Sequence, residues 1–354
     1  LRYLKKIFYN SVAELRMKSK YRNLFLLFGI VAIAVMLLTF DVSYAELTDS
    51  LRKAGLCFPV VIFLWVLIYL LNAGAWYIII HDGFRGDKIP YWRVYKYTVT
   101  GFALNATTPV GLMGGEPYRI MELAPYVGVE KATSSVILYV MMHIFSHFCF
   151  WLFSILLYLV LYFHHLQWSL SLFLAFSGIF CLMGVYFFMK GYRQGLAMRC
   201  IRLLQRVFFL KRWAINFAEK KQETLQRIDD QIAELHSKHR VTFYTSLGAE
   251  FFARVLSCAE IYFILSIFTD TISYWDCILI LAFTSLFANA LFFLPMQLGG
   301  REGGFALAVG GLSMPYAYGV YMGLIMRLRE LVWIILGIGL MKFGNKNSLK
   351  SKRI

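Results

Sequence analysis

Long apolar runs separated by short polar segments organise most of the chain. A helix of about 20 apolar residues crosses the roughly 30 Å hydrocarbon core of a bilayer. Runs that fit this length, and that we predict to be membrane-spanning helices, occur at residues 24–40, 55–80, 134–163, 170–189, 241–268, 278–294 and 316–341. The sequence therefore predicts an all-α fold, a polytopic transmembrane helix bundle with about 7–8 spans.

Two segments, residues 94–124 and 295–315, are interrupted by Gly, Pro and Asn and are too broken for one clean span. Irregular backbone at membrane depth occurs only where protein buries it or where it lines a water-filled cavity. The segments share an order of residues that indicates an internal repeat: Asn105, Pro109, Gly114, Gly115, Glu116 and Arg119 in the first, and Asn289, Pro295, Gly299, Gly300, Arg301 and Glu302 in the second. Paired broken segments are typical of a transporter's substrate site, so we predict two broken or re-entrant helices that meet near the middle of the bilayer.

Each broken segment contains a predicted helix start. Glu116 followed by Pro117 is typical of an N-cap and a first helical position, so a short helix should begin there and end before Pro125. A second helix should begin near Arg301. Helix N-termini carry unpaired amides and partial positive charge, and with Arg119 or Arg301 beside them they would form an anion site. The alternative interpretation is a helix-breaking connection with a structural salt bridge.

Two polar segments carry apolar stripes at helical spacing. Residues 1–22 are predicted to form an amphipathic helix on an anionic membrane surface, and residues 190–240 a basic cytoplasmic linker of amphipathic helices. The stripes are Leu4, Ile7, Phe8, Val12 and Leu15 in the first segment, and Leu225, Ile228, Ile232 and Leu235 in the second. The predicted domains are, in order, a surface helix (1–22), a first transmembrane half (23–189), the linker (190–240), a second transmembrane half (241–342) and a basic tail (343–354).

Composition and charge support a membrane protein. Hydrophobic residues make up 59% of the 354 residues and charged residues only 16%, so a soluble globule of this size could not bury its apolar surface. The formal charge is +16, but 24 of the 36 Lys and Arg residues lie in three blocks, at 1–22, 190–240 and 342–353. Such blocks follow the positive-inside rule, which predicts a cytoplasmic N-terminus and argues against nucleic-acid binding. The side of the C-terminus depends on whether 295–315 crosses or re-enters.

Two predicted spans carry charged residues: Glu250, Arg254 and Glu260 in one, and Arg327, Arg329 and Glu330 in the last. Each charge costs about 2.5–3.5 kcal/mol at the centre of a membrane helix. Glu250 shares a helix face with Arg254. Likewise Arg327 shares a face with Glu330, whereas Arg329 points to another side and needs a different partner. These residues either face a functional cavity, with Arg327 as the preferred partner of a lipid phosphate, or form salt bridges that fix helix packing.

No metal or cofactor pattern is visible. His143 and His147 are four residues apart on a predicted span, a spacing that can bind a metal, but no Glu completes an H-E-x-x-H pattern. We therefore interpret both as hydrogen-bonded packing residues. The six cysteines contain no C-x-x-C pair, which is typical of buried free thiols. The prediction is no metal site and no cofactor.

The stretches LNATTPVGLMGGEPYR and LPMQLGGREGG resemble the two signature stretches of the lysylphosphatidylglycerol synthase transmembrane-region family, whose members are flippase-like membrane proteins. The resemblance follows span order over nearly the whole chain, but only these stretches are specific. It implies a polytopic inner-membrane protein that moves a lipid between leaflets. Larger members also carry a soluble aminoacyltransferase domain, and because the resemblance here covers the membrane part alone, it does not imply synthase activity. The second stretch departs from the family by lacking a small or apolar residue between Gly300 and Arg301.

The leading hypothesis is a multi-pass lipid translocase of the bacterial cytoplasmic (inner) membrane that moves an anionic phospholipid or lipid-linked headgroup without catalysing a reaction. Its partner would be an anionic membrane lipid, with oligomerisation left open. The alternative is an integral membrane transferase that acts on a lipid-linked substrate, with Glu116 or Glu302 as a general base. The predicted substrate-binding residues are Asn105, Thr108, Gly114, Gly115, Glu116, Arg119, Glu250, Arg254, Gly299, Gly300, Arg301, Glu302, Arg327 and Glu330.

Overall fold

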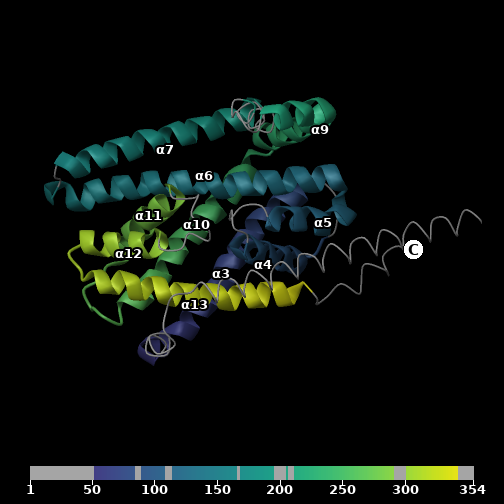
Figure 1. Ribbon diagram of the computed structural model, residues 1–354. Helices are drawn as coiled ribbons and strands as arrows, with labels where there is room; N and C mark the ends of the chain where they lie inside the picture. The colour runs from purple at the N-terminus through teal and green to yellow at the C-terminus, as the bar shows by residue number, and fades with distance from the viewer. Residues whose placement is uncertain are drawn as a thin grey trace, which may run out of the picture.

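The computed structural model describes residues 52–83, 89–107, 114–165, 168–194, 205, 211–290 and 300–341 (Figure 1). Every regular element within these ranges is a helix, so the predicted all-α bundle is confirmed. The predicted surface helix at 1–22, the predicted span at 24–40 and the basic tail at 343–354 lie outside the described residues.

Three of the described helices are long and apolar enough to cross a membrane. They are α3 (Cys57–Ile78), which continues into a π-helical turn (Ile79–Gly83), α6 (Val129–Tyr162), which ends in a 3-10 turn (Phe163–His165), and α7 (Trp168–Gln194). All three coincide with predicted spans. Because their apolar residues surround the whole helix instead of forming one stripe, these helices suit a lipid environment.

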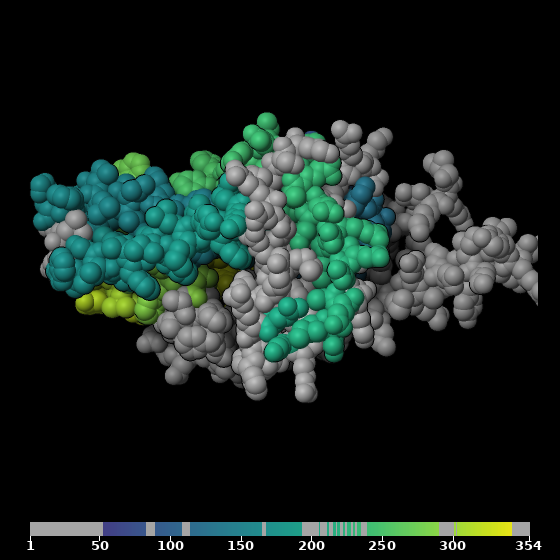
Figure 2. All heavy atoms as spheres, turned by 90° about the horizontal axis from the view of Figure 1, so that it is seen from above, coloured from purple at the N-terminus to yellow at the C-terminus, as the bar shows by residue number. Residues whose placement is uncertain are grey.

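An apolar surface runs along α7, which packs beside α6 at the top of Figure 1 and faces the viewer in Figure 2. Phe176, Met183 and Tyr186 are all more than 60% exposed on it. Exposed apolar area of this extent is unfavourable in water. In a bilayer it is matched by acyl chains, so α7 presents its outer face to lipid.

Two further long helices, α10 (Arg240–Leu265) and α13 (Tyr316–Leu340), coincide with the predicted charged spans. At 1.5 Å per residue they are about 39 and 38 Å long, enough to cross a bilayer. Their charged side chains are turned inward: Glu250, Glu260 and Arg329 are each less than 5% exposed. The charges therefore avoid lipid by facing the centre of the bundle.

Two pairs of short helices lie at the broken segments, and the helices of each pair pack against each other. The first pair covers the broken segment 94–124, whereas the second consists of a helix at the predicted span 278–294, which is only 17 residues long, and a helix inside the broken segment 295–315. The first pair is α4 (Tyr91–Thr107) and α5 (Gly115–Val127), and the second is α11 (Tyr274–Ala290) and α12 (Gly300–Gly311). The helices are 12 to 17 residues long, at most about 26 Å, which is shorter than a typical hydrocarbon core. The connections at 108–113 and 291–299 lie outside the described residues.

The predicted start and end of the first short helix are wrong by one to three residues. α5 begins at Gly115, before Glu116, because the side-chain oxygen of Asn105 accepts a hydrogen bond from the Gly115 amide at 2.7 Å. It continues past Pro125 to Val127 and stops where Gly128 adopts a φ of 85°. A proline in a last turn removes one helix hydrogen bond without preventing the turn. The second start is confirmed, since α12 begins at Gly300, beside Arg301.

The two ends of the bundle are formed by different connections. At one end, Arg227 of α9 (Lys211–Lys238) pairs with Glu130 at the start of α6, at 3.2 Å. At the other end, the hydroxyl of Tyr162 donates to Asp276 at the start of α11, at 2.6 Å. The pair α4 and α5 lies toward the α9 end and the pair α11 and α12 toward the opposite end (Figure 1). The two broken segments therefore approach the middle of the bundle from opposite directions.

Candidate functional site

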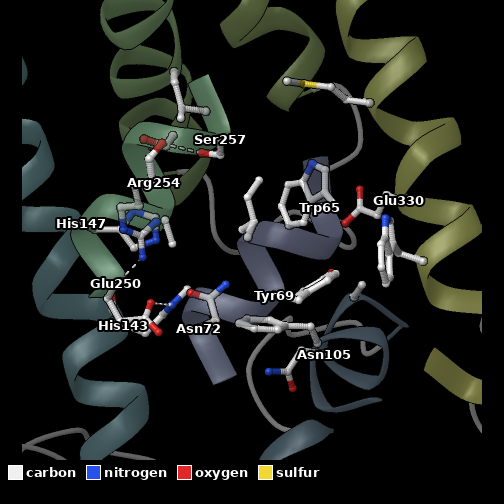
Figure 3. Close-up of a pocket in the computed structure, with 18 of the residues that line it drawn as sticks. Trp65, Tyr69, Asn72, Asn105, His143, His147, Glu250, Arg254, Ser257 and Glu330 are labelled. Carbon is white, nitrogen blue, oxygen red and sulfur yellow. Dashed lines mark hydrogen bonds and ion pairs between the residues drawn. The ribbon is translucent and has the colours of Figure 1, made fainter. Parts of the chain in front are cut away.

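A cavity of about 460 Å³ lies where the two broken segments approach each other. Its walls are the middle portions of α3, α6, α10 and α13 (Figure 3). The C-terminal parts of α4 and α11 and the N-terminal parts of α5 and α12 complete the lining. Both broken segments contribute side chains to this cavity, and direct contact between the two segments stays a prediction. Its volume falls within the range of about 300–1,000 Å³ that is typical of ligand pockets.

Asn105 fixes the inner end of the first pair of helices. Its oxygen accepts from the Gly115 amide, and its Nδ2 donates to Oε1 of Glu116 at 2.8 Å. The helices cross so closely that a Cβ on Gly115 would lie 2.1 Å from the carbonyl oxygen of Gly101. Glycine at both positions is what allows Asn105 to cap α5 from α4.

Arg119 is the most deeply buried cation of the site, at 1% exposure. Its guanidinium pairs with Glu116 at 3.4 Å and donates to the carbonyl oxygen of Thr98 at 3.3 Å. It also lies over the rings of Phe102 and Tyr139, with centroid distances of 4.8 and 5.2 Å. Cation–π contacts and one carboxylate offset the cost of removing this charge from water.

The inner end of the second pair is held by an ion pair to the last helix. Arg301, in the first turn of α12, donates to Oε2 of Glu330 on α13 at 2.9 Å. Both side chains are about a quarter exposed, so water in the cavity reaches them. Asn289 lines the cavity at the end of α11, in the position that Asn105 occupies at the end of α4.

A second ion pair crosses the cavity wall between α10 and α13. Arg329 binds both carboxylate oxygens of Glu260, at 2.9 and 3.1 Å, in a bidentate arrangement. Trp65 of α3 donates its indole N–H to the same carboxylate at 2.8 Å, and its ring lies 3.9 Å from the Arg329 guanidinium. The side chains of the pair are 5% and 2% exposed. The separate partner that the sequence predicts for Arg329 is therefore Glu260, on α10.

Glu250 and Arg254 share a face of α10 but bind different groups of α6. Oε2 of Glu250 lies 2.7 Å from Nδ1 of His143. Arg254 donates to the hydroxyl of Ser146 and to the carbonyl oxygen of His143, each at 2.8 Å. Arg254 forms no ion pair with a carboxylate of the described residues, so its charge faces the cavity without a bound counter-charge (Figure 3).

The formal charges of the described arginines and glutamates that line the cavity sum to zero. The described lining contains four arginines and four glutamates: Arg119, Arg254, Arg301, Arg329, Glu116, Glu250, Glu260 and Glu330. With neutral histidines their formal charges cancel. Since each isolated charge would cost several kcal/mol in a low-dielectric interior, the set is stabilised by three Arg–Glu pairs, by the hydrogen bonds of Glu250 and Arg254 to α6, and by the overall neutrality of the cavity.

Half of the fourteen predicted site residues line this cavity. Asn105, Glu116, Arg119, Glu250, Arg254, Arg301 and Glu330 line it. Gly114 and Gly115 are buried at the start of α5, and Gly300 begins α12. Thr108 and Gly299 lie outside the described residues, as does the side chain of Glu302.

Arg327, the preferred phosphate partner at the sequence level, does not line the cavity. It is two positions from Arg329 and therefore about 200° around α13. The lining face of that helix is instead formed by Met326, Arg329, Glu330, Trp333 and Ile334. Arg327 is buried on another side of α13, at 5% exposure.

Sequence reasoning did not identify the hydrogen-bond partner of His143. Its partner Glu250 is 107 positions away, so no local pattern connects them. The available signal was that Glu250, a buried acid in an apolar helix, requires a polar partner. Among the described residues no group of three or more His, Cys, Asp or Glu could hold a metal ion.

One comparison with known proteins gives a match. A protein-family model described as "Lysylphosphatidylglycerol synthase TM region" matches residues 26–339, which include both broken segments and all the charged residues of the cavity. Comparisons with curated proteins and with solved structures give no match.

Proposed function

The chain belongs to the lysylphosphatidylglycerol synthase TM region family, and from that premise we propose that it is a lipid translocase that moves an anionic phospholipid or lipid-linked headgroup between leaflets. The family and the apolar helices make the protein a multi-pass membrane protein. We place it in the bacterial cytoplasmic membrane with its N-terminus in the cytoplasm. The protein would move the lipid without changing the chemical structure of the lipid.

The observation that carries the proposal is the charge-balanced cavity in the middle of the helix bundle. Eight charged side chains at this depth are expensive to maintain for packing alone. A passing phosphate headgroup needs cations that line the cavity and can exchange one anion for another. Arg301 and Arg254 fit that role, because the first pairs with a partly exposed carboxylate and the second, among the described residues, binds neutral acceptors.

The two helix pairs supply a route to the cavity in this proposal. The N-terminal ends of α5 and α12 lie at the cavity, where their partial positive charge favours an anion. Because the pairs approach from opposite ends of the bundle, movement of one pair would open the cavity toward one leaflet and movement of the other pair toward the other. The headgroup would pass through the polar space while the acyl chains stay in lipid.

Reconstitution in liposomes tests the proposal directly. Purified protein is inserted into vesicles that contain one fluorescent lipid, either phosphatidylglycerol, phosphatidylcholine or a polyprenyl phosphate, and the outer-leaflet label is destroyed by a membrane-impermeant reductant. We expect the protected fraction of an anionic lipid to fall from about half toward zero with protein present. Equal protection with and without protein for every lipid would reject a translocase.

Arg254→Gln is the site variant for the same assay. Losing a charge-assisted contact to phosphate, which contributes about 1.5–3 kcal/mol, should slow transport of the anionic lipid by about tenfold to a hundredfold. Arg227→Gln on α9 is the matched control, since it removes the same charge from an exposed position outside the cavity and should leave the rate unchanged. Equal rates for both variants and the parent would remove Arg254 from the site.

The transferase alternative has a distinct outcome in these vesicles. Mass spectrometry of the recovered lipids would show a changed headgroup, with no change in leaflet distribution. Such a result would replace the translocase by an enzyme that acts on a membrane lipid.

A further inference from the structure

Glu250 is the one acid in the described cavity lining that binds a histidine, His143, instead of an arginine. An ionised carboxylate only accepts hydrogen bonds, so Nδ1 of His143 carries the hydrogen that lies toward Oε2 of Glu250, 2.7 Å away. The other ring nitrogen is then free to accept a proton. Histidine is the side chain whose ordinary pKa, about 6.5, allows that exchange near neutral pH.

In this pair the histidine is accessible to water and the glutamate is buried. The His143 side chain is 30% exposed and lines the cavity, whereas Glu250 is 1% exposed. The second carboxylate oxygen of Glu250 is buried and has no hydrogen-bond partner among the described residues. The pair therefore contains a buried hydrogen-bond acceptor that the packing of the helices leaves unsatisfied among the described residues.

The charged and titratable groups around His143 come from three helices. They are Glu250 and Arg254 on α10, Arg119 on α5, and Tyr139 and His147 on α6. Glu250 attracts an imidazolium, whereas the two guanidinium groups repel it. Arg119 already has a carboxylate partner, so Arg254 is the neighbour whose charge a bound anion would cancel.

We propose that the His143–Glu250 pair is a proton-binding site that takes up one proton from water when an anionic headgroup binds at Arg254, and releases it when the headgroup leaves. This proposal rests on the proposed function and adds its coupling ion. A phosphodiester brings one negative charge into a lining whose formal charges cancel, and an imidazolium at His143 restores the balance. The proton adds to the free ring nitrogen and no other bond forms or breaks. A lipid and a proton would thus move together, which allows a pH gradient to drive transport.

Calorimetry measures this coupling without a transport assay. The full-length protein in phosphatidylcholine nanodiscs is titrated with dihexanoyl phosphatidylglycerol near pH 7.5, in buffers of different ionisation enthalpy, which gives the number of protons taken up per lipid bound. We expect about one proton for the parent. By linkage, the Kd should also rise about tenfold per pH unit above the titration of the free site. This second measurement needs no variant, so it decides the question even if a substitution prevents folding.

Two substitutions on α6 locate the proton. His143→Gln keeps a hydrogen-bond donor for Glu250 but cannot become charged, and it should bind the lipid with no proton uptake and no pH-dependent Kd. His147→Gln is the matched control, because this ring is the neighbour of His143, 5.5 Å away, and has no carboxylate partner among the described residues. It should retain about one proton per lipid.

The outcomes separate the coupling from the proposed function. Lipid binding by the parent without proton uptake overturns the proton site and leaves the translocase intact. Proton uptake that persists in His143→Gln also overturns it. Failure of the parent to bind the anionic lipid at any pH overturns the coupling and counts against the translocase as well.

Discussion

Each acid in the described lining of the cavity has a specific base, and the pairs differ in burial and in number of bonds. Glu260 and Arg329 are almost fully buried and joined by two hydrogen bonds, whereas Glu330 and Arg301 are partly exposed and joined by one. Bidentate pairs of buried groups fix geometry. A partly exposed ion pair joined by one hydrogen bond exchanges partners more easily. The Glu260–Arg329 pair is therefore structural, whereas the Glu330–Arg301 pair is suited to releasing its arginine to bind a substrate.

Breaking the buried pair should strongly destabilise the protein. Arg329→Ala leaves Glu260 as an uncompensated buried charge, which costs about 3–5 kcal/mol in comparable cases. We expect a clearly lower thermal unfolding midpoint in detergent, and a similar loss for Glu260→Ala. The double variant should recover part of the loss, because it leaves no stranded charge.

An exposed pair on the same protein provides the control. Arg227 and Glu130 are 57% and 47% exposed, so Arg227→Ala should change stability by less than about 1 kcal/mol. If Arg329→Ala were no more destabilising than Arg227→Ala, the assignment of a structural role to the buried pair would be wrong.

At the scale of elements, the close crossing of α4 and α5 determines where Arg119 lies. A Cβ on Gly101 would come within 2.2 Å of Nε of Arg119, and one on Gly115 would strike the backbone of Gly101. The two glycines therefore make room for the guanidinium and for the cap by Asn105. The requirement for glycine at position 115 of the first broken segment has its physical reason in this contact.

Gly115→Ala tests the crossing. The new methyl group would lie 2.1 Å from a backbone oxygen, and separating two helices to relieve such a clash costs about 1–3 kcal/mol. We expect a lower unfolding midpoint and slower lipid transport, since Asn105 and Arg119 move with the helices.

Gly303→Ala is the matched control for that substitution. A Cβ at Gly303, in the first turns of α12, meets nothing within 4 Å, and Ala is the better helix former by about 1 kcal/mol. Stability should be unchanged or slightly higher. Equal effects of the two substitutions would show that helix propensity, and not the contact with Gly101, governs Gly115.

At the scale of the whole molecule, the ends of several helices meet beside the basic linker. Buried residues from the end of α7, from α9 and from the start of α10 pack in one core cluster with Met341 at the end of α13. The end of α13 therefore lies at the same end of the bundle as α9, which belongs to the predicted basic linker. The number of complete crossings stays a prediction, because the four short helices do not have the length of a span.

Cysteine labelling in intact cells tests the orientation. Glu223→Cys on α9, 89% exposed, should react with a membrane-impermeant maleimide only after the cells are permeabilised. Asp270→Cys, in the connection between α10 and α11, should react in intact cells, because that connection carries no basic block and the positive-inside rule then places it outside. The parent protein, whose described cysteines lie buried or half-buried, measures background labelling. Labelling of Glu223→Cys in intact cells would invert the predicted topology.

The sequence by itself determined the class of protein, the helices and the composition of the site. Apolar run length predicted α3, α6 and α7, and the order of Asn, Gly, Glu and Arg in the broken segments predicted that Asn105, Arg119 and Arg301 belong together. These features are local, because helix length and helix face follow from spacing along one segment.

Only the tertiary structure decided which charges meet. Glu250 binds His143, Glu260 binds Arg329 and Glu330 binds Arg301, although these partners lie 107, 69 and 29 positions apart. Spacing gives the face of a residue on its own helix, but the rotation of one helix against another is set by packing over the whole bundle. For the same reason the cavity takes Arg329 and excludes Arg327, two residues that the sequence presents as equally charged neighbours in one apolar span.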